Sequence, residues 1–291
     1  MPIKYFTKEW YLRKFWMFFP EHRYWYYTKK IYHESSGKRM RYRKPIDLSE
    51  KLIWLTRYWR NPLKTICADK FLVRNYVQDR GYNHILIPLL AVYDSVEEID
   101  FNALPNEFIV KCNHGSGCNI ICTDKSQFDI EDAKIKLNQW MNTDYSEMMY
   151  ELHYKDISRK IICEKLISTN APIEYQFWCL NGKAESILVC RKNFDGTYDA
   201  NSYSLNWERL YDRINENYQV IFEKPNNLNE LISIAEDLAE PFPFVRADFY
   251  VVDDKIYFAE LTFTPAGNLL PQYTESFKKR LGGGWNCRVN Y

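Results

Sequence analysis

Four polar side chains near the end of the chain occupy alternate positions in two apolar runs, 244–252 and 256–263. They are Arg246, Asp248, Glu260 and Thr262. Side chains along a strand alternate between its two faces, so both runs must place their apolar residues on one buried face. A three-residue loop, Asp253–Lys255, keeps this parity. It predicts a hairpin in which Asp248 lies opposite Glu260 and Arg246 lies opposite Thr262.

This pairing has a chemical consequence, because two carboxylates directly opposite each other on neighbouring strands repel. A hard divalent ion such as Mg²⁺ prefers oxygen ligands, keeps several waters and is often completed by substrate phosphates. The hairpin therefore predicts a magnesium site at Asp248 and Glu260. The alternative is a solvent-exposed strand face on which the two acids are screened and bind nothing.

A second candidate for anion chemistry is the segment Lys111-Cys112-Asn113-His114-Gly115-Ser116-Gly117, which follows the predicted strand 108–111. Its glycines would let backbone N–H groups approach a phosphate, and Lys111 adds a positive charge. The segment matches neither G-x-x-x-x-G-K-[ST] nor G-x-G-x-x-G, so an ordinary tight turn is the alternative. We expect His114 to position the loop or a phosphate rather than to act as a base; the alternative is a plain turn residue.

The elements that would position these residues follow from apolar spacing and turn residues. Helices are predicted over 48–60, 68–80, 131–142 and 228–238. Asp47 and Glu50 resemble a capping box before the first of them. Strands are predicted over 108–111, 120–122, 161–167 and 84–92, the last an edge or interrupted strand because of Pro88. Asn181-Gly182 predicts a further hairpin. This mixture of strands, hairpins and helices indicates an α+β fold.

Composition excludes several classes of protein. The chain has 291 residues, 46% of them hydrophobic, with 10 Gly and 12 Pro, which excludes collagen-like, disordered and coiled-coil chains. The apolar run 15–19 is too short for a signal peptide, and no stretch approaches the roughly 20 apolar residues of a membrane span. The eight cysteines include no C-x-x-C. We therefore expect a cytoplasmic protein without disulfides.

Charge is divided unevenly along the chain. Residues 1–60 contain 15 Lys and Arg against 5 Asp and Glu, a balance of +10, whereas the whole chain carries +1. The basic, aromatic segment 1–45 could therefore face an anionic glycan or contact the inner face of an anionic membrane, and no nucleic acid partner is expected. The alternative is a packed helical extension with a solvated basic face.

Taken in order, these segments resemble the nucleotide-binding signature of the ATP-grasp superfamily, and more narrowly its TupA-like branch, named for teichuronopeptide biosynthesis. The resemblance rests on Asp69-Lys70 with Arg74 and on the segments 104–117, 163–167, 181–183, 244–249 and 258–263. It implies an ATP-grasp fold in which two α+β lobes clasp a nucleotide. The expected units are an extension (1–45), a helical and strand region (46–104), a first lobe with the Gly-rich loop (105–165) and a second lobe with the metal site (166–291).

The resemblance implies ATP and Mg²⁺ as cofactors and gives the site residues their roles. Lys70 and Lys111 would contact the phosphates under the loop His114, Gly115, Ser116 and Gly117. Glu164, with Lys165 and Leu166, would bind the adenine edge, and Glu174 the ribose. Asp248 and Glu260 would hold Mg²⁺ with the hydroxyl of Thr262, where many members carry Asn, and Arg246 would steady the transferring phosphoryl group. Arg191, after the apolar run 186–189, is a further candidate contact to a phosphate or carboxylate.

The implied activity is that of an ATP-dependent carboxylate–amine ligase, which forms an amide through an acyl phosphate. The branch implies a uronic acid of a surface polysaccharide as the carboxylate and an amino acid or other amine as the second substrate. One alternative is an ATP-grasp kinase or phosphotransferase acting on a glycan, and another is a non-catalytic glycan-binding or scaffold protein. A glycosyltransferase is disfavoured because the sequence has no Asp-x-Asp motif.

Overall fold

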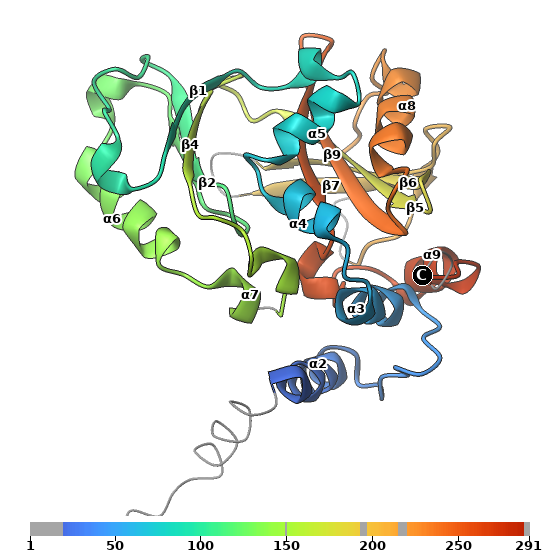
Figure 1. Cartoon of the computed structure of the whole chain (residues 1–291). Coiled ribbons are helices and arrows are strands. Elements are labelled where there is room, and N and C mark those ends of the chain that lie inside the picture. The colour runs from blue at the N-terminus through green and yellow to red at the C-terminus, as the bar shows by residue number, and fades with distance from the viewer. Residues whose placement is uncertain (1–19, 149, 193–196, 215–219, 288–291) are drawn as a thin grey trace, which may run out of the picture.

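Two antiparallel sheets form the framework of the molecule (Figure 1). The computed structural model describes residues 20–148, 150–192, 197–214 and 220–287. The first part of the basic extension, 1–19, therefore lies outside the described residues. Helices and antiparallel strands together confirm the predicted α+β class.

The smaller sheet has four strands in the order β1-β4-β2-β3. Their bounds are β1 Leu89–Tyr93, β2 Phe108–Cys112, β3 Asn119–Cys122 and β4 Ile161–Lys165. The register of β1 is irregular between Leu89 and Ala91, and the strand lies at the sheet edge, as Pro88 predicts. Helix α6, Ile130–Met141, shares a core with this sheet through Ala133 and Leu137.

The larger sheet has six strands in the order β10-β9-β5-β6-β7-β8. Their bounds are β5 Ile173–Leu180, β6 Lys183–Lys192, β7 Tyr198–Tyr203, β8 Arg209–Leu210, β9 Phe244–Val252 and β10 Lys255–Thr262. Helix α8, Leu228–Ala239, buries Leu231 and Ala235 in the core that contains Phe177 and Phe249. Since strand side chains alternate, the polar positions between these apolar ones face away from α8.

The hairpin of β9 and β10 has the predicted pairs but a different loop. Glu260 pairs with Asp248, and Thr262 pairs with Arg246. The predicted three-residue loop is wrong, because Asp253 and Asp254 alone form the turn, with φ of 51° and 58°. Asp tolerates this left-handed conformation better than most residues. A register shift between Phe258 and Glu260, a β-bulge, adds one residue and so restores the pairing of the two acids. The hairpin at Asn181-Gly182 is confirmed.

The remaining helices lie mainly before the sheets in the chain. They are α2 Pro20–Ser36, α3 Leu48–Tyr58, α4 Pro62–Ala68, α5 Val73–Asp79, α7 Tyr145–Met148 and α9 Glu275–Gly283, with short 3₁₀ turns η1 Asn83–Ile85, η2 Val96–Glu98, η3 Lys125–Gln127, η4 Leu152–Tyr154 and η5 Pro265–Asn268. The side chain of Asp47 caps α3, accepting a 2.9 Å bond from the N–H of Glu50. The predicted helix 68–80 is present only as α5, because it begins at Val73 rather than at residue 68. Asp69 Oδ1 accepts from the N–H groups of Phe71 and Leu72, and the resulting turn separates α4 from α5.

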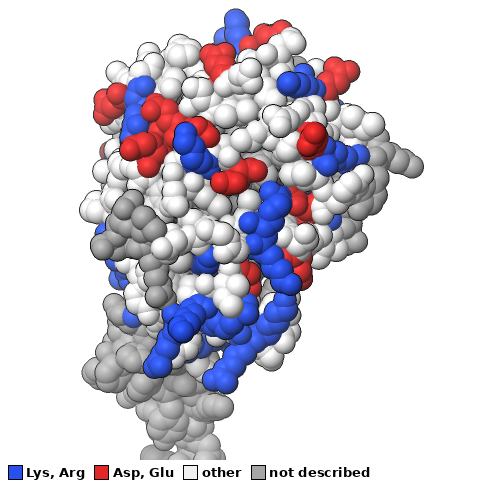
Figure 2. All heavy atoms as spheres, turned by 90° about the vertical axis from the view of Figure 1, so that its right-hand side faces the viewer, with Lys and Arg blue, Asp and Glu red and all other residues white. Residues whose placement is uncertain are grey.

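The described part of the N-terminal extension packs against α3. Tyr32 and Met40 share a small core with Ile53, and the Tyr24 hydroxyl donates to the Ile53 carbonyl at 3.1 Å. A packed helical extension is thus confirmed for this part. Cationic side chains gather at the lower end of the face in Figure 2, where α2 and the loop after it lie in Figure 1. A partner for this basic surface stays a prediction.

Two further expectations concern membranes and disulfides. None of the helices within the described ranges is both long and apolar enough to cross a bilayer. All eight cysteines are buried, and none of them forms a disulfide.

Candidate active site between the two sheets

The two predicted metal carboxylates lie on one face of the larger sheet with an arginine beside them. Asp248 is fully buried. Two nitrogens of Arg246, Nε and Nη2, donate hydrogen bonds to its carboxylate, and Nε lies 2.8 Å from Oδ1. The same guanidinium lies 3.8 Å from Glu260 Oε1 and 3.2 Å from Thr262 Oγ1. The repulsion expected between the opposed acids is therefore offset here by a cation from the chain itself.

Lys70 connects this cluster to the Gly-rich loop of the smaller sheet. Its Nζ donates to the carbonyl of Gly115 at 2.6 Å and lies 3.7 Å from Glu260 Oε2. Its side chain is only 16% exposed, so it is not a solvated surface lysine. Because α4 ends at Ala68, Lys70 lies in the turn rather than on a helix. The turn brings its ammonium group between the two sheets.

Asn113 holds that turn in place, a role that sequence reasoning missed. Its fully buried amide donates to Asp69 Oδ1 and to the Ser158 carbonyl, both at 2.9 Å. Its backbone carbonyl accepts from the N–H of Lys70 at 3.0 Å. The sequence did contain a signal for this role, an Asp before a helix start and an Asn beside a Gly-rich turn. Both residue types commonly form hydrogen bonds with nearby backbone.

The Gly-rich loop is a tight turn with two left-handed glycines, Gly115 at φ 79° and Gly117 at φ 76°. A Cβ on Gly115 would lie 2.6 Å from the Tyr145 ring, whereas one on Gly117 would meet open space. Ser116 and Gly117 are exposed. The ring of His114 is buried against Tyr145, its Nε2 lies 3.3 Å from the Trp140 carbonyl, and burial lowers its pKa. These contacts agree with a positioning role, which stays a prediction.

Lys111 and Glu164 form an ion pair on the facing strands β2 and β4. Lys111 Nζ lies 2.6 Å from Glu164 Oε2, and Arg74 Nη1 lies 3.0 Å from the other oxygen of the same buried carboxylate. Arg74 also donates to the Ile87 carbonyl at 2.8 Å. The Glu164 carboxylate is thus engaged by two cations, and its contact with adenine stays a prediction. The adjoining Lys165 is exposed and Leu166 is buried.

Glu174 lies on the same sheet face as Asp248, because it is two positions from Gln176, which pairs with Asp248. It accepts a 3.1 Å bond from Gln176, and burial raises its pKa. Arg191 does not join the site. Glu174 pairs with Cys190, so strand alternation places Arg191 on the opposite face, where it lies 3.3 Å from Asp199. The expectation that Arg191 contacts phosphate is therefore not supported.

The donor set of the cluster fits Mg²⁺. Thr262 Oγ1 lies 2.8 Å from Glu260 Oε1 and 3.4 Å from Asp248 Oδ2, so three hard oxygen donors converge. Burial favours the neutral form of Glu260, but Lys70, Arg246 and Thr262 together outweigh it, and the pKa of Glu260 falls below its usual value. In the described part of the chain, no three His, Cys, Asp or Glu residues form a metal cluster. The protein would supply two carboxylates and one hydroxyl.

The chain is similar to known proteins in sequence and in fold. A model of the family described as TupA-like ATPgrasp matches residues 50–285. A search of curated proteins found no match. Among solved structures, a D-alanine–D-alanine ligase from Bacillus anthracis is 19% identical with a TM-score of 0.40, over 72% of this chain and 59% of that one.

Two other solved structures resemble the chain at a similar level. An L-amino acid ligase from Bacillus licheniformis is 14% identical with a TM-score of 0.46, over 76% of this chain and 49% of its own. The ATP-grasp ligase PsnB, solved with Mg and ADP, is 10% identical with a TM-score of 0.41, over 79% and 60%. The chain thus spans between about half and three fifths of the length of these proteins.

Proposed function

Because this chain belongs to the TupA-like ATP-grasp family, we propose that it is an ATP-dependent carboxylate–amine ligase. Its carboxylate substrate is a uronic acid of a surface polysaccharide, and its second substrate is an amino acid or another amine. The observation that carries the proposal is the cluster of Asp248, Glu260 and Arg246 within reach of Lys70, which is bonded to the Gly-rich loop.

The reaction brings a carboxylate anion to the γ-phosphate of ATP, so positive charge must surround the transferred group. Lys70, Lys111 and Arg246 supply it from three segments of the chain. Attack by the carboxylate oxygen breaks the bond to the β,γ-bridging oxygen and gives an acyl phosphate and ADP. The amine nitrogen then attacks the acyl carbon, loses a proton and releases phosphate, which forms the amide.

The residues have distinct tasks in this scheme. Mg²⁺ held by Asp248, Glu260 and Thr262 would offset the charge of the phosphates. Arg246 would exchange one of its contacts with Asp248 for a phosphoryl oxygen. Lys70, fixed by the Asp69 and Asn113 bonds, would reach the phosphates from the Gly-rich side. The loop 114–117 would exclude water, which would otherwise hydrolyse the acyl phosphate.

The test is ADP formation from MgATP with uronates crossed against amino acids, with products read by mass spectrometry. We expect one pair to give ADP, phosphate and a product lighter than the two substrates by one water. Asp248→Asn and Glu260→Gln should each lower the rate at least about a hundredfold, as expected for loss of a group that orients charge in the transition state. Glu185→Gln, an exposed acid on β6, is the matched control and should keep the parent rate.

Other outcomes identify the alternatives. A phosphorylated sugar formed without amine would indicate a kinase. Glycan binding with no ADP formation in the parent protein, unchanged in Asp248→Asn and Glu260→Gln, would indicate a non-catalytic binding protein. Either result would overturn the ligase proposal.

A further inference from the structure

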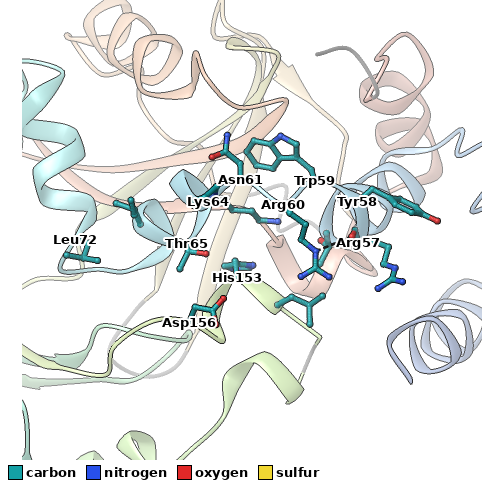
Figure 3. A pocket seen from close by; sticks show the side chains of 14 residues that line it. Arg57, Tyr58, Trp59, Arg60, Asn61, Lys64, Thr65, Leu72, His153 and Asp156 are labelled. Atoms are coloured by element: carbon teal, nitrogen blue, oxygen red, sulfur yellow. Dashed lines mark hydrogen bonds between the residues drawn. The ribbon is translucent and has the colours of Figure 1, made fainter. Parts of the chain in front are cut away.

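A pocket of about 870 Å³ opens next to the end of α3 (Figure 3). Its lining comes from the end of α3, from α4 and from η4 and the residues after it, rather than from the cluster itself. Thr65 and Leu72 line it, and Lys70 lies between them in the chain. The pocket therefore adjoins the turn that carries a proposed phosphate lysine.

The lining is cationic, with one acid opposing three basic side chains. The basic residues are Arg57, Arg60 and Lys64, and the acid is Asp156. In Figure 3 the side chains of Lys64 and His153 lie one above the other, with Arg60 beside them. A pocket of this composition favours an anion over a neutral or cationic ligand.

Lys64 is a buried lysine in the wall of the pocket. Its residue is only 5% exposed. Its ammonium group lies 5.9 Å from the Trp59 ring centre and 5.7 Å from that of Phe263. Burial lowers the pKa of Lys64 to about 7, because an ammonium removed from water is destabilised unless an anion joins it.

His153 adds a buried ring whose nitrogens are unsatisfied within the described structure. It is 6% exposed, and neither ring nitrogen has a hydrogen-bond partner among the described residues. Burial lowers its pKa well below the usual value, so the ring is neutral and offers one donor and one acceptor. A ligand with charged and hydroxyl oxygens would satisfy both this ring and Lys64, and leaving such groups buried without partners is costly.

Lys64 also connects the pocket to the carboxylate cluster. Phe263, over which it lies, directly follows Thr262 in the chain. Glu151 lies between the two regions: its carboxylate accepts from the Thr264 hydroxyl and interacts electrostatically with Lys64 and with Glu260. An anion bound at Lys64 would thus lie next to the end of β10 that carries the proposed metal site.

The remaining lining suits a ring with an apolar face. Trp59 is buried in the wall, and Tyr58 is 49% exposed. Flat aromatic surfaces with polar edges contact the C–H faces of sugars well. We infer that this pocket is the subsite for the carboxylate substrate, and that this substrate is an anionic sugar whose carboxylate pairs with Lys64 and Arg60; the inference rests on the proposed ligase function.

The test is direct binding of glucuronate to the full chain by isothermal titration calorimetry without ATP. Glucose is the neutral comparison and glucose 1-phosphate is the phosphate comparison. We expect saturable binding of glucuronate, at least about tenfold tighter than that of glucose, because Lys64 and Arg60 attract an anion, and no weaker than that of glucose 1-phosphate. Lys64→Met, which keeps the stem, and Arg60→Gln, at the exposed rim, should each weaken glucuronate binding at least about tenfold.

Lys155→Gln removes an exposed lysine next to η4 that does not line the pocket, and it should leave glucuronate binding unchanged. The inference is overturned if glucuronate shows no saturable binding, if glucose 1-phosphate binds more tightly, or if Arg60→Gln and a folded Lys64→Met bind as the parent does. Because no ATP is present, these results are independent of whether the chain forms ADP, so failure of the ligase proposal is seen separately.

Discussion

Arg246 is the single residue on which the geometry of the candidate site most depends. It lies two positions from Asp248 on β9 and reaches Asp248, Glu260 and Thr262 with one guanidinium group. Removal of one partner of a buried ion pair leaves the other charged without compensation. The arginine therefore stabilises the fold as well as serving the proposed chemistry.

This dual role predicts a specific result for Arg246→Gln. We expect its free energy of unfolding to fall by about 3 to 5 kcal/mol, because Asp248 stays buried and loses both of its contacts with the guanidinium. The double variant Arg246→Gln with Asp248→Asn should regain a large part of that loss, since no unpaired carboxylate remains at 248. Urea unfolding of both single variants and the double variant measures the coupling. Strictly additive effects would show that the pair is not energetically coupled.

At the scale of elements, two short turns position the proposed phosphate-binding groups. The turn after α4 presents Lys70, and the Gly-rich loop accepts its bond through the Gly115 carbonyl. Asn113 joins the two turns and the start of β4 through its side chain and backbone. These bonds join segments far apart in the chain and fix the position of Lys70.

The two glycines of the loop allow a matched comparison. Both have positive φ, so Gly115→Ala and Gly117→Ala should each cost about 1 kcal/mol of stability from backbone strain. Gly115→Ala should cost a further ~1 to 3 kcal/mol, because only its Cβ meets the Tyr145 ring. Chemical denaturation measures the difference. Tyr145→Ala in the Gly115→Ala background should reduce the extra loss, and equal costs for the two alanine variants would contradict the predicted clash.

At the scale of the whole molecule, the proposed site is assembled from both sheets. The smaller sheet contributes Lys111 and the Gly-rich loop, and the larger contributes Asp248 and Glu260. A ligand that contacts both sheets would stabilise the folded chain. The gain in the free energy of unfolding grows with the logarithm of the ratio of ligand concentration to Kd.

MgATP is therefore expected to raise the melting temperature. At about a hundredfold excess over Kd the gain is ~2.7 kcal/mol, which for a chain of this size is roughly 4 to 5 °C. ATP with EDTA should give a smaller shift, since the carboxylates need the ion to approach the phosphates. Differential scanning fluorimetry of the parent, Asp248→Asn and Glu185→Gln distinguishes the site from nonspecific stabilisation. A full shift in Asp248→Asn would argue against nucleotide binding at this cluster.

Several features of the fold and site were predictable from local sequence alone. The alternation around Asp248 and Glu260 predicted their pairing, and Asn181-Gly182 predicted its hairpin, because strand period and turn chemistry depend on adjacent residues. The order of the segments also predicted the family that the comparison shows. The same local rules failed at the loop of the last hairpin, where a bulge supplied the extra residue.

The sequence by itself determined which residue types could do phosphate chemistry and on which strands they alternate. Only the tertiary structure decided that Arg246 lies between the opposed acids. It also decided that Lys70 contacts Gly115 beside the smaller sheet and Glu260 on the larger one, and that Arg191 lies on the opposite sheet face from Glu174. It also decided that Lys64 is buried beside a cationic pocket. These facts join residues far apart in the chain, and such contacts depend on how the elements pack rather than on any local periodicity.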